Sequence, residues 1–432
     1  MTRYRLLIPL LIILLGVIWY SNSQLPFSSS AYLPGPQLTA ADRVMIVAVH
    51  PDDETIATGG LINYCTLHQI PVRVVVLTDG GYKGTADLRH NETLNATSVL
   101  GLHPSDVTFL GFPDGSLYYL FNHNWDLENP YLNGQGSSRV NCSYAFRENQ
   151  TICGVHLVQD LEEIINQFQP SVIIYPDGND QQEDHKSAQA FLEYTTLHLN
   201  YTGKTCNYLV HFAYSWPYPR TYNPEYSLLP PEQFEDANWN VFPINTIMER
   251  NKEAALKSYH SQVGLSSYLL SFIRKNELFS SYDTFNVKLD GNTSQILYFT
   301  DPAGQEYNHN PPPNLDLKQV GVQVQNNKLW LYLQTAAPPS ASGYYCFRIV
   351  GLGSSVSRWD IQIHQGQAKS LKVNSQSEKL QDLKTEVHGS KLTVEIPLES
   401  FEKSDKIILS AYTSKGQGTV DPSRWQVINV KK

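Results

Sequence analysis

The apolar run from Val44 to Val49 most constrains the fold, because it is uninterrupted and ends directly in His50-Pro51-Asp52-Asp53-Glu54. A strand buried on both faces has this pattern, and such strands belong to parallel sheets covered by helices. Ligands bind at the carboxyl ends of these strands. A histidine and a carboxylate three positions apart can reach one metal ion, while the other carboxylate acts as a base on a metal-bound water. An acidic strand-to-helix loop, with Asp52 or Asp53 as helix N-cap, explains the spacing equally well.

Strands and helices alternate after residue 43, which predicts a doubly wound, mostly parallel, Rossmann-like α/β sheet. A further strand at 209–214 and two closing helices at 248–259 and 266–273 are also expected. The expected core strands are 44–49, 72–77, 107–110 and 172–175, and the expected helices are 55–68, 87–100, 155–168 and 185–197.

The pattern changes after about residue 282 to short alternating strands, with a hairpin expected around Asn326-Asn327. The sequence therefore predicts an α/β domain at 43–282 and a C-terminal all-β sandwich domain at 283–432. Exposed aromatics of the sandwich could bind carbohydrate, but packing against the first domain is slightly favoured. The aromatics in question are Trp330, Tyr332, Trp359 and Trp425.

The first 24 residues have the pattern of a signal peptide or an uncleaved N-terminal membrane anchor, followed by a linker at 25–42. Arg3 and Arg5 precede an uncharged apolar stretch, and no clear cleavage site follows. Either alternative predicts an exported chain in a periplasmic, extracytoplasmic or lumenal space, anchored to a membrane or secreted.

The formal charge of −9, without a basic run in the mature part, argues against nucleic acid as a partner. The five cysteines include no C-x-x-C pair, which argues against a cysteine zinc site. Because export permits disulfides, Cys142 and Cys153 are the expected pair.

Four expected strands end in polar clusters, and parallel strands present all their carboxyl ends at one edge of a sheet. The last cluster continues as Gln181-Gln182-Glu183-Asp184-His185 into a helix, which makes His185 a candidate third metal ligand. Two histidines and one carboxylate with an open position form the ligand set of a hydrolytic zinc site. The clusters are His50-Pro51-Asp52-Asp53-Glu54, Thr78-Asp79-Gly80-Gly81, Phe112-Pro113-Asp114-Gly115 and Pro176-Asp177-Gly178-Asn179-Asp180.

Over residues 43–280 the sequence resembles the LmbE-like, or PIG-L, family of N-acetylglucosaminyl de-N-acetylases. The strongest motif is Ala48-Val49-His50-Pro51-Asp52-Asp53-Glu54, which is similar to the family's A-H-P-D-D-E signature. Further motifs follow in the family's order: Thr78-Asp79-Gly80, Arg89 with Glu92, Leu110-Gly111-Phe112-Pro113-Asp114, Asp184-His185 and His260-Ser261-Gln262.

The resemblance implies a zinc-dependent hydrolase that removes acetyl groups from N-acetylated amino sugars, such as N-acetylglucosamine-type glycoconjugates. It implies that His50, Asp53 and His185 bind Zn²⁺, although such a site also accepts other divalent transition metals. Asp52 would be the general base. Asp114 would contact substrate, although a turn residue explains it equally well.

Arg89 is also expected to contact substrate by the resemblance, although a surface ion pair with Glu92 explains it equally well. Gln182 stands where many members carry a histidine; it can donate a hydrogen bond to an oxyanion but cannot titrate. Asp52 would then move both protons unless His260 reaches the site. Hydrolysis of another amide-bearing conjugate and an inactive glycan-binding homologue remain the alternatives.

Overall fold

The computed structural model describes residues 33–81, 84–213, 216–263, 268–288, 295–302, 311–378, 383–416 and 418–431. The segment expected at 1–24 to be a signal peptide or membrane anchor lies outside the described residues. Within the described ranges, no helix has the length and apolar character needed to span a membrane.

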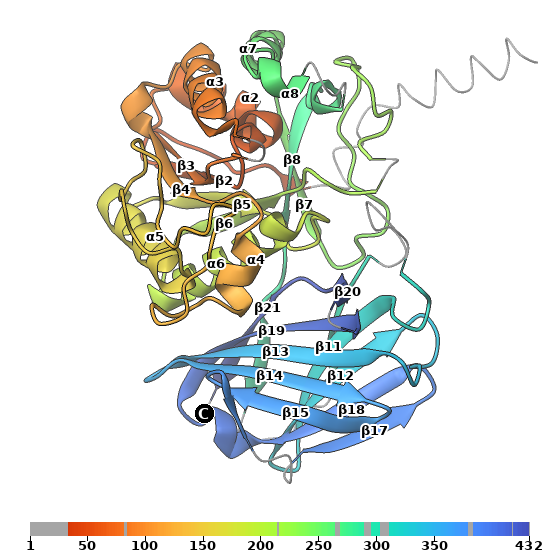
Figure 1. Ribbon diagram of the computed structural model, residues 1–432. Coiled ribbons are helices and arrows are strands. Elements are labelled where there is room, and N and C mark those ends of the chain that lie inside the picture. Colours follow the sequence, from red (N-terminus) through yellow and green to blue (C-terminus); the bar gives the residue numbers. More distant parts are fainter. Residues whose placement is uncertain are drawn as a thin grey trace, which may run out of the picture.

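An eight-stranded sheet forms the upper half of the molecule, with strand order β1-β7-β8-β6-β5-β2-β3-β4 (Figure 1). Neighbours from β6 to β4 are parallel, whereas β8 runs antiparallel to both β6 and β7. The predicted mostly parallel α/β fold is confirmed. The strands are β1 (Leu33–Pro34), β2 (Val44–Ala48), β3 (Val72–Thr78), β4 (Val107–Phe112), β5 (Val172–Pro176), β6 (Lys204–Tyr208), β7 (Asn238–Pro243) and β8 (Asn276–Ser281).

Helices cover both faces of this sheet, which explains why the residues of β2 form a continuous apolar run. Val44 and Ile46 belong to the hydrophobic core shared with α2 and α7, whereas Met45 and Val47 belong to the core shared with α5 and α6. All four are fully buried. The helices are α2 (Asp53–Leu67), α3 (Ala86–Val99), α4 (Leu117–Asn122), α5 (Gly154–Phe168), α6 (Glu183–His198), α7 (Thr246–Leu256) and α8 (His260–Val263).

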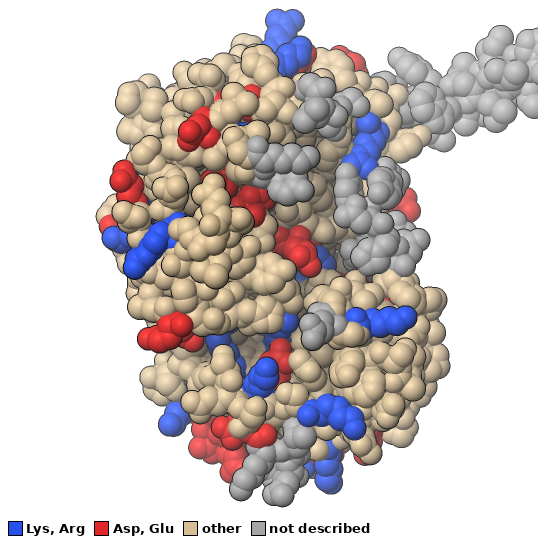
Figure 2. All heavy atoms as spheres, in the orientation of Figure 1, with Lys and Arg blue, Asp and Glu red and all other residues tan. Residues whose placement is uncertain are grey.

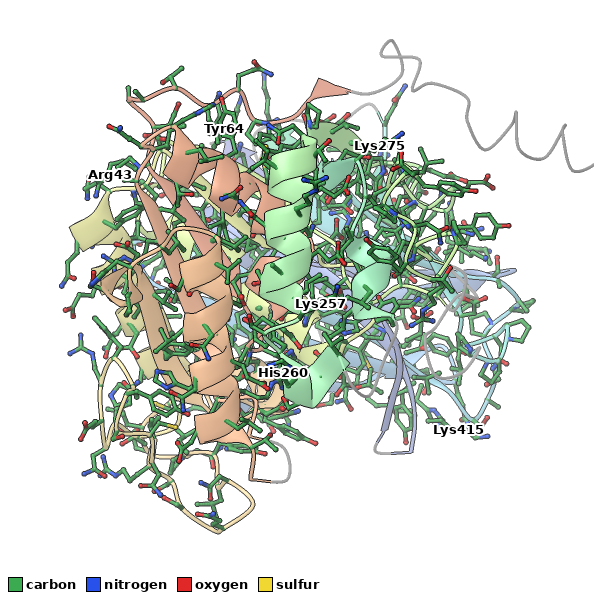
Figure 3. The ribbon with its side chains drawn as sticks, turned by 90° about the horizontal axis from the view of Figure 1, so that it is seen from above. Arg43, Tyr64, Lys257, His260, Lys275 and Lys415 are labelled. Atoms are coloured by element: carbon green, nitrogen blue, oxygen red, sulfur yellow. The ribbon has the colours of Figure 1, made fainter. Side chains whose placement is uncertain are left out.

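Seen from above, α7 lies beside α2 and α3, and His260 lies just beyond the end of α7 (Figure 3). Asn245 starts α7, because its side chain accepts hydrogen bonds from the backbone N–H groups of Ile247 and Met248. Gln182 starts α6 in the same way by accepting from the N–H of His185. The helix that carries His185 therefore begins at a fixed residue.

Several details of the sequence prediction are wrong. The described residues 209–213 of the strand expected at 209–214 form no strand, and the chain pairs with β5 earlier, along β6. The sequence of β6, Lys-Thr-Cys-Asn-Tyr, lacks the apolar run that marks a buried strand. Helix α4 was not expected, and the described part of the helix expected at 266–273 is a short 3-10 turn, Leu269–Phe272.

The expected disulfide between Cys142 and Cys153 is not formed, because both side chains are free thiols. Cys142 Sγ lies 3.9 Å from the carbonyl of Gly111 on β4, whereas Cys153 is fully buried at the start of α5. The two thiols are therefore held in different surroundings, although they are close in sequence.

Two β-sheets pack face to face in the lower half of the molecule and form the predicted sandwich (Figure 1). One has the order β10-β11-β12-β18-β17, and the other β16-β15-β14-β13-β19-β21-β9, with β20 paired to β19. Asn326 and Asn327 turn the expected hairpin, both with positive φ (53° and 60°). The strands are β9 (Phe285–Lys288), β10 (Leu297–Thr300), β11 (Leu317–Gln325), β12 (Lys328–Thr335), β13 (Tyr344–Gly353), β14 (Ser357–His364), β15 (Gln367–Val373), β16 (Gln376–Ser377), β17 (Lys384–His388), β18 (Lys391–Pro397), β19 (Ser404–Lys415), β20 (Gly418–Pro422) and β21 (Gln426–Lys431).

The sandwich packs against the α4 and α6 side of the upper half. Trp425, only 8% exposed, stacks edge-on against Phe121 of α4, and both belong to one continuous hydrophobic core with Phe191 of α6. Lys186 donates to the carbonyl of Pro422 across the same junction at 2.6 Å. At least one of the four sandwich aromatics singled out in the sequence is therefore a packing residue.

A buried ion pair ties α7 to β8 and α2. Glu277 accepts from Lys252 Nζ at 2.7 Å and from the N–H groups of Gly60 and Leu61 at 2.7 and 2.8 Å. Lys252 and Glu277 are each 1% exposed. We expect Glu277→Gln to lower the free energy of unfolding by about 3–5 kcal/mol in urea denaturation, because it leaves the buried ammonium of Lys252 without a counter-charge.

A matched control is available on the same helix. Lys257 pairs with Glu253 at 2.6 Å, but its side chain is 56% exposed. Lys257→Gln should change the free energy of unfolding by no more than about 0.5 kcal/mol. Similar losses for the two variants would contradict a structural role for the buried pair.

Candidate active site at the carboxyl ends of β2 and β5

The order of strands in the upper sheet places a crevice at the ends of β2 and β5. The chain leaves β2 for α2 and β3 on one side, and leaves β5 for α6 and β6 on the other. Such a reversal of strand order opens a gap between the two connections, which is where open α/β sheets bind ligands. His50 to Asp53 follow β2, and the loop from Asp177 to Gln182 follows β5.

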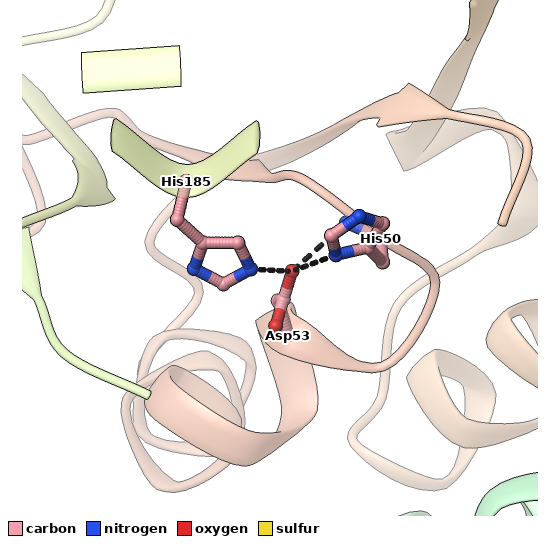
Figure 4. Close-up of side chains that lie close together, drawn as sticks. All are labelled: His50, Asp53 and His185. Atoms are coloured by element: carbon pink, nitrogen blue, oxygen red, sulfur yellow. Dashed lines mark hydrogen bonds and ion pairs between the residues drawn. The ribbon is translucent and has the colours of Figure 1, made fainter. Parts of the chain in front are cut away.

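His50, Asp53 and His185 converge at this gap (Figure 4). Asp53 Oδ2 lies 3.6 Å from His50 Nδ1 and 3.2 Å from His185 Nε2. One ligand atom of each side chain lies within 4.8 Å of the other two, a spacing that could hold a single metal ion. All three residues are buried. The structure thus brings together the three side chains that the sequence proposed as metal ligands.

Asp180 fixes the second nitrogen of His185. Its Oδ2 lies 3.2 Å from His185 Nδ1, and it also accepts from the N–H groups of Val210 and His211 at 3.0 and 2.9 Å. Burial lowers the pKa of His185, but Asp180 and Asp53 raise it to about 10. A carboxylate behind an imidazole is the usual outer support of a metal-binding histidine, since it orients the ring and increases its basicity.

Arg89 holds the Asp52 carboxylate, and the backbone of Asp52 itself is strained. Asp52 has φ of 135°, which only the fit of its surroundings can maintain. Its N–H donates to Glu54 Oε2 at 3.2 Å, and its Oδ2 accepts from Arg89 Nη2 at 3.0 Å. Arg89 Nη2 also donates to the carbonyl of Pro51. Burial raises the pKa of Asp52 to about 7, although Arg89 lowers it.

The outer nitrogen of His50 faces two more carboxylates. His50 Nε2 lies 3.3 Å from Asp114 Oδ1 and 3.5 Å from Asp184 Oδ2. Asp184 also accepts from the N–H groups of Gly115 and Leu117 at 2.7 and 3.0 Å. Its place behind His50 lets Asp184 orient that imidazole.

A pocket of about 240 Å³ opens onto these groups. Among its described lining residues, the carboxylates outnumber the single cation, Arg89. This charge balance and the donor set suit a divalent cation, because nitrogen and oxygen ligands of this kind bind zinc and related metals. The pocket is lined by His50, Asp52, Asp53, Ile56, Arg89, Asp114, Gln182, His211, Gln262 and Leu269.

Six of the seven residues predicted for the site line this pocket, and the seventh, His185, is buried behind Asp53. The alternative pairing of Arg89 with Glu92 is wrong, since Glu92 accepts from the N–H and hydroxyl of Ser261 instead. His260 is exposed and does not line the pocket.

Sequence reasoning missed His211 and gave no role to Asp180. His211 was hidden in the strand expected at 209–214; a strand ending at Tyr208 would have placed it at the crevice.

Residues 45–195 match a family model described as PIG-L: GlcNAc-PI de-N-acetylase. Among solved structures, the chain is similar to the conserved protein TT1542 from Thermus thermophilus, at 20% identity over 56% of this chain and 94% of that chain, with a TM-score of 0.38. It is also similar to N,N'-diacetylchitobiose deacetylase from Pyrococcus horikoshii, at 20% identity over 51% and 70% of the two chains, with a TM-score of 0.32. For the deacetylase of the A40926 pseudoaglycone, the identity is 14% over 55% and 96%, and the TM-score is 0.38. The family match includes all seven predicted site residues.

Gly80 allows Arg89 to approach Asp52. Its φ is +57°, and a Cβ there would lie 2.7 Å from Pro51 Cδ and 2.8 Å from Arg89 Nη1. Gly84 has a similar φ of +78°, but a Cβ there would meet no atom of the described residues within 4 Å. We expect Gly84→Ala to cost about 1 kcal/mol of unfolding free energy for backbone strain alone, and Gly80→Ala to cost about 1–3 kcal/mol more for overpacking. Urea denaturation of both variants measures the difference; equal losses would show that Arg89 and Pro51 move aside freely.

Proposed function

Because residues 45–195 form a PIG-L (LmbE-like) domain, we propose that this protein is a metal-dependent hydrolase that removes the acetyl group from N-acetylated amino sugars, with zinc as the metal. The observation that carries the proposal is the position of Asp52. Its carboxylate lines the pocket directly beside the His50, Asp53 and His185 cluster, yet is not one of the three converging ligands.

Two of the three converging side chains have the atom that would hold the ion defined by their neighbours. His185 would bind through Nε2, because Asp180 holds its Nδ1. Asp53 would bind through Oδ2, which already faces both imidazoles. A bound divalent ion would polarise the amide carbonyl as a Lewis acid and would lower the pKa of water enough for it to serve as a nucleophile at neutral pH.

Asp52 would move the proton. It accepts a proton from the attacking water at its carboxylate and then gives it to the departing amine nitrogen, so that the C–N bond breaks to release acetate and a free amino sugar. Arg89 positions this carboxylate through the 3.0 Å contact between Nη2 and Oδ2. The strained Asp52 backbone keeps the side chain at the pocket.

The other polar groups of the pocket would bind the substrate. Gln182 uses its Oε1 to accept from the N–H of His185, and its Nε2, which lies 3.5 Å from His50 Nε2, would donate to the oxyanion formed from the amide carbonyl. Asp114, whose side chain is 20% exposed, would accept hydrogen bonds from sugar hydroxyls.

Measuring the metal content of variants distinguishes the three possible ligand clusters of the site. Asp53 belongs only to the His50 and His185 cluster, whereas His211 and Asp114 each belong to a different one. We expect Asp53→Asn to abolish zinc binding, His211→Ala and Asp114→Asn to retain it, and Asp180→Asn to weaken it about 10- to 100-fold as an outer support. Metal analysis after dialysis against a chelator series measures this. If Asp53→Asn retained zinc and His211→Ala lost it, the metal would instead be assigned to the cluster that contains His211.

Acetate release from a panel of N-acetylglucosamine conjugates tests the reaction. Asp52→Asn should lower kcat by about 10²- to 10⁴-fold, because it removes the proton acceptor, while its zinc content stays that of the wild type. Asp87→Asn, an exposed carboxylate on α3, is the control and should keep full activity.

Full deacetylase activity of Asp52→Asn with zinc bound would refute the assigned base. Activity confined to amides that carry no sugar would refute the substrate class, and sugar binding without any acetate release would point to an inactive homologue.

A further inference from the structure

The active-site pocket is small. Its volume of about 240 Å³ lies below the range of about 300–1,000 Å³ that is typical of small-molecule sites, so it suits a single sugar residue. If the substrate is a longer glycan, its next residue must bind outside the pocket, on the surface that adjoins the rim. Asp114 lines the pocket and its side chain is 20% exposed, so the pocket reaches the surface at this residue.

The chain runs from Asp114 directly into α4, whose first end lies at the active site. The N–H groups of Gly115 and Leu117 donate to the carboxylate of Asp184 at 2.7 and 3.0 Å. The same carboxylate lies 3.5 Å from His50 Nε2. Gly115 is exposed, and a Cβ there would meet no described atom within 4 Å. The surface between the pocket and α4 is thus open at Gly115.

Tyr119 is the exposed aromatic residue in the first turn of α4. It is 45% exposed, whereas its neighbours Leu120 and Phe121 are buried in the core. Side chains of an α-helix lean toward the N-terminus of the helix. The ring of Tyr119 therefore leans toward the end of α4 that Asp184 holds, which is the end nearest the active site.

Tyr131, from the loop after α4, adds a second ring beside the first. The ring centres of Tyr119 and Tyr131 lie 5.6 Å apart, and their planes are inclined by 34°. The N–H of Tyr131 donates to the carbonyl of the buried Ile152 at 2.8 Å, which fixes this part of the loop. Burial raises the pKa of the Tyr131 hydroxyl, and Tyr119 and the carboxylate of Asp184 raise it further. Tyr131 therefore lies within range of the charge at the active site.

The surface around these two residues, the tyrosine pair, is largely uncharged. Helix α4 contains no charged residue, and Leu132, next to Tyr131, is 59% exposed. Figure 2 shows mainly uncharged side chains in the region of α4. A pyranose ring carries C–H groups on its faces and hydroxyls around its edge, so it can pack on a tyrosine ring and also bond to a tyrosine hydroxyl. A hydrocarbon chain would cover the rings too, but it offers the hydroxyls no hydrogen bond.

We propose that the tyrosine pair is a second sugar subsite, which binds the glycan residue next to the acetylated one. The neighbouring sugar ring stacks on Tyr119, and Tyr131 contacts its edge. The substrate is then an uncharged oligosaccharide instead of a single amino sugar, an inference that rests on the proposed function for the residue in the pocket. Neither tyrosine lines the pocket, so the pair contributes to substrate affinity and not to the chemical step.

Binding of N-acetylglucosamine and of its β-linked dimer is measured by ligand-observed NMR titration of the full-length, zinc-loaded Asp52→Asn protein. We expect the dimer to bind at least about fivefold more tightly than the monomer. Tyr119→Ala should weaken dimer binding about three- to tenfold and leave monomer binding unchanged. Tyr119→Phe, which keeps the ring, should lose at most about threefold.

A matched control is Tyr222→Ala. Tyr222 is 43% exposed, its hydroxyl donates to Glu253 of α7 at 2.9 Å, and it belongs neither to the pocket lining nor to α4. This variant should bind both sugars like the parent protein. Thermal melting checks that every variant is folded, and Tyr131→Ala keeps the test valid if Tyr119→Ala unfolds.

Kinetics in protein that retains Asp52 separate a subsite from a structural role. Tyr119→Ala and Tyr131→Ala should each raise KM for the dimer about three- to tenfold and leave kcat within about twofold, because stacking outside the pocket binds ground state and transition state alike. Neither variant should change KM or kcat for the monomer. A loss of kcat for both substrates would show that the tyrosines only support the fold.

The proposal is wrong if the dimer binds no more tightly than the monomer, or if Tyr119→Ala and Tyr131→Ala both leave dimer affinity unchanged. Equal weakening of monomer and dimer by Tyr119→Ala would also overturn it. The octyl glycoside of N-acetylglucosamine is the further comparator. If it gained as much affinity from the tyrosine pair as the dimer does, the surface would be assigned to a hydrocarbon chain instead of a sugar.

The subsite and the proposed function can fail separately. Tyrosine-dependent binding of the dimer without acetate release from any sugar would refute the hydrolase and keep the subsite. Acetate release from the monomer without any gain in affinity for the dimer would refute the subsite and keep the hydrolase.

Discussion

The parallel pairing of β2 with β5 is the constraint on which the candidate site depends. Val44 pairs with Val172 and Ile46 with Ile174, so both strands end at the same edge of the sheet. The connections leave these two strands in opposite directions, so no crossover fills the gap between the strand ends. The segments that follow β2 and β5 therefore face each other across this gap. Only this arrangement lets an imidazole after β2 and an imidazole at the start of α6 share one carboxylate.

Backbone donors hold the carboxylates of the site in place. Asp180 accepts from the N–H groups of Val210 and His211, and Asp53 accepts from that of His50 at 2.8 Å. Each of these carboxylates thus loses little hydrogen bonding when it is buried. A site preorganised in this way gives a divalent ion its ligands without a large rearrangement, which favours both affinity and catalysis.

The sequence was sufficient for the parts of the site that follow strongly patterned strands. His50 and Asp53 adjoin an apolar run, and position 185 lies in the first turn of a helix, so sheet topology alone brought them together. Prediction failed where the pattern was weak. Strand β6 has Lys204 and Thr205 at its exposed start and the buried polar residue Asn207 near its end, so it lacks an apolar pattern. Its true end at Tyr208 was missed together with His211. The burial of Arg89 could not be predicted either, because its ion pair with Asp52 depends on a tertiary contact with no local signal.

The sandwich also bears on the site, through α6. Lys186, the residue after His185, donates to the carbonyl of Pro422, and Gln189 Nε2, one turn further along, donates to the carbonyl of Trp425 at 3.0 Å. Gly178, in the loop between β5 and α6, has no room for a Cβ, which would lie 2.7 Å from Arg424 Cβ. The loop and first turn that position His185 are therefore packed between the α/β sheet and the C-terminal strands. An accessory domain placed there restricts the motion of a metal ligand, because a rotation of α6 would break contacts on both of its sides.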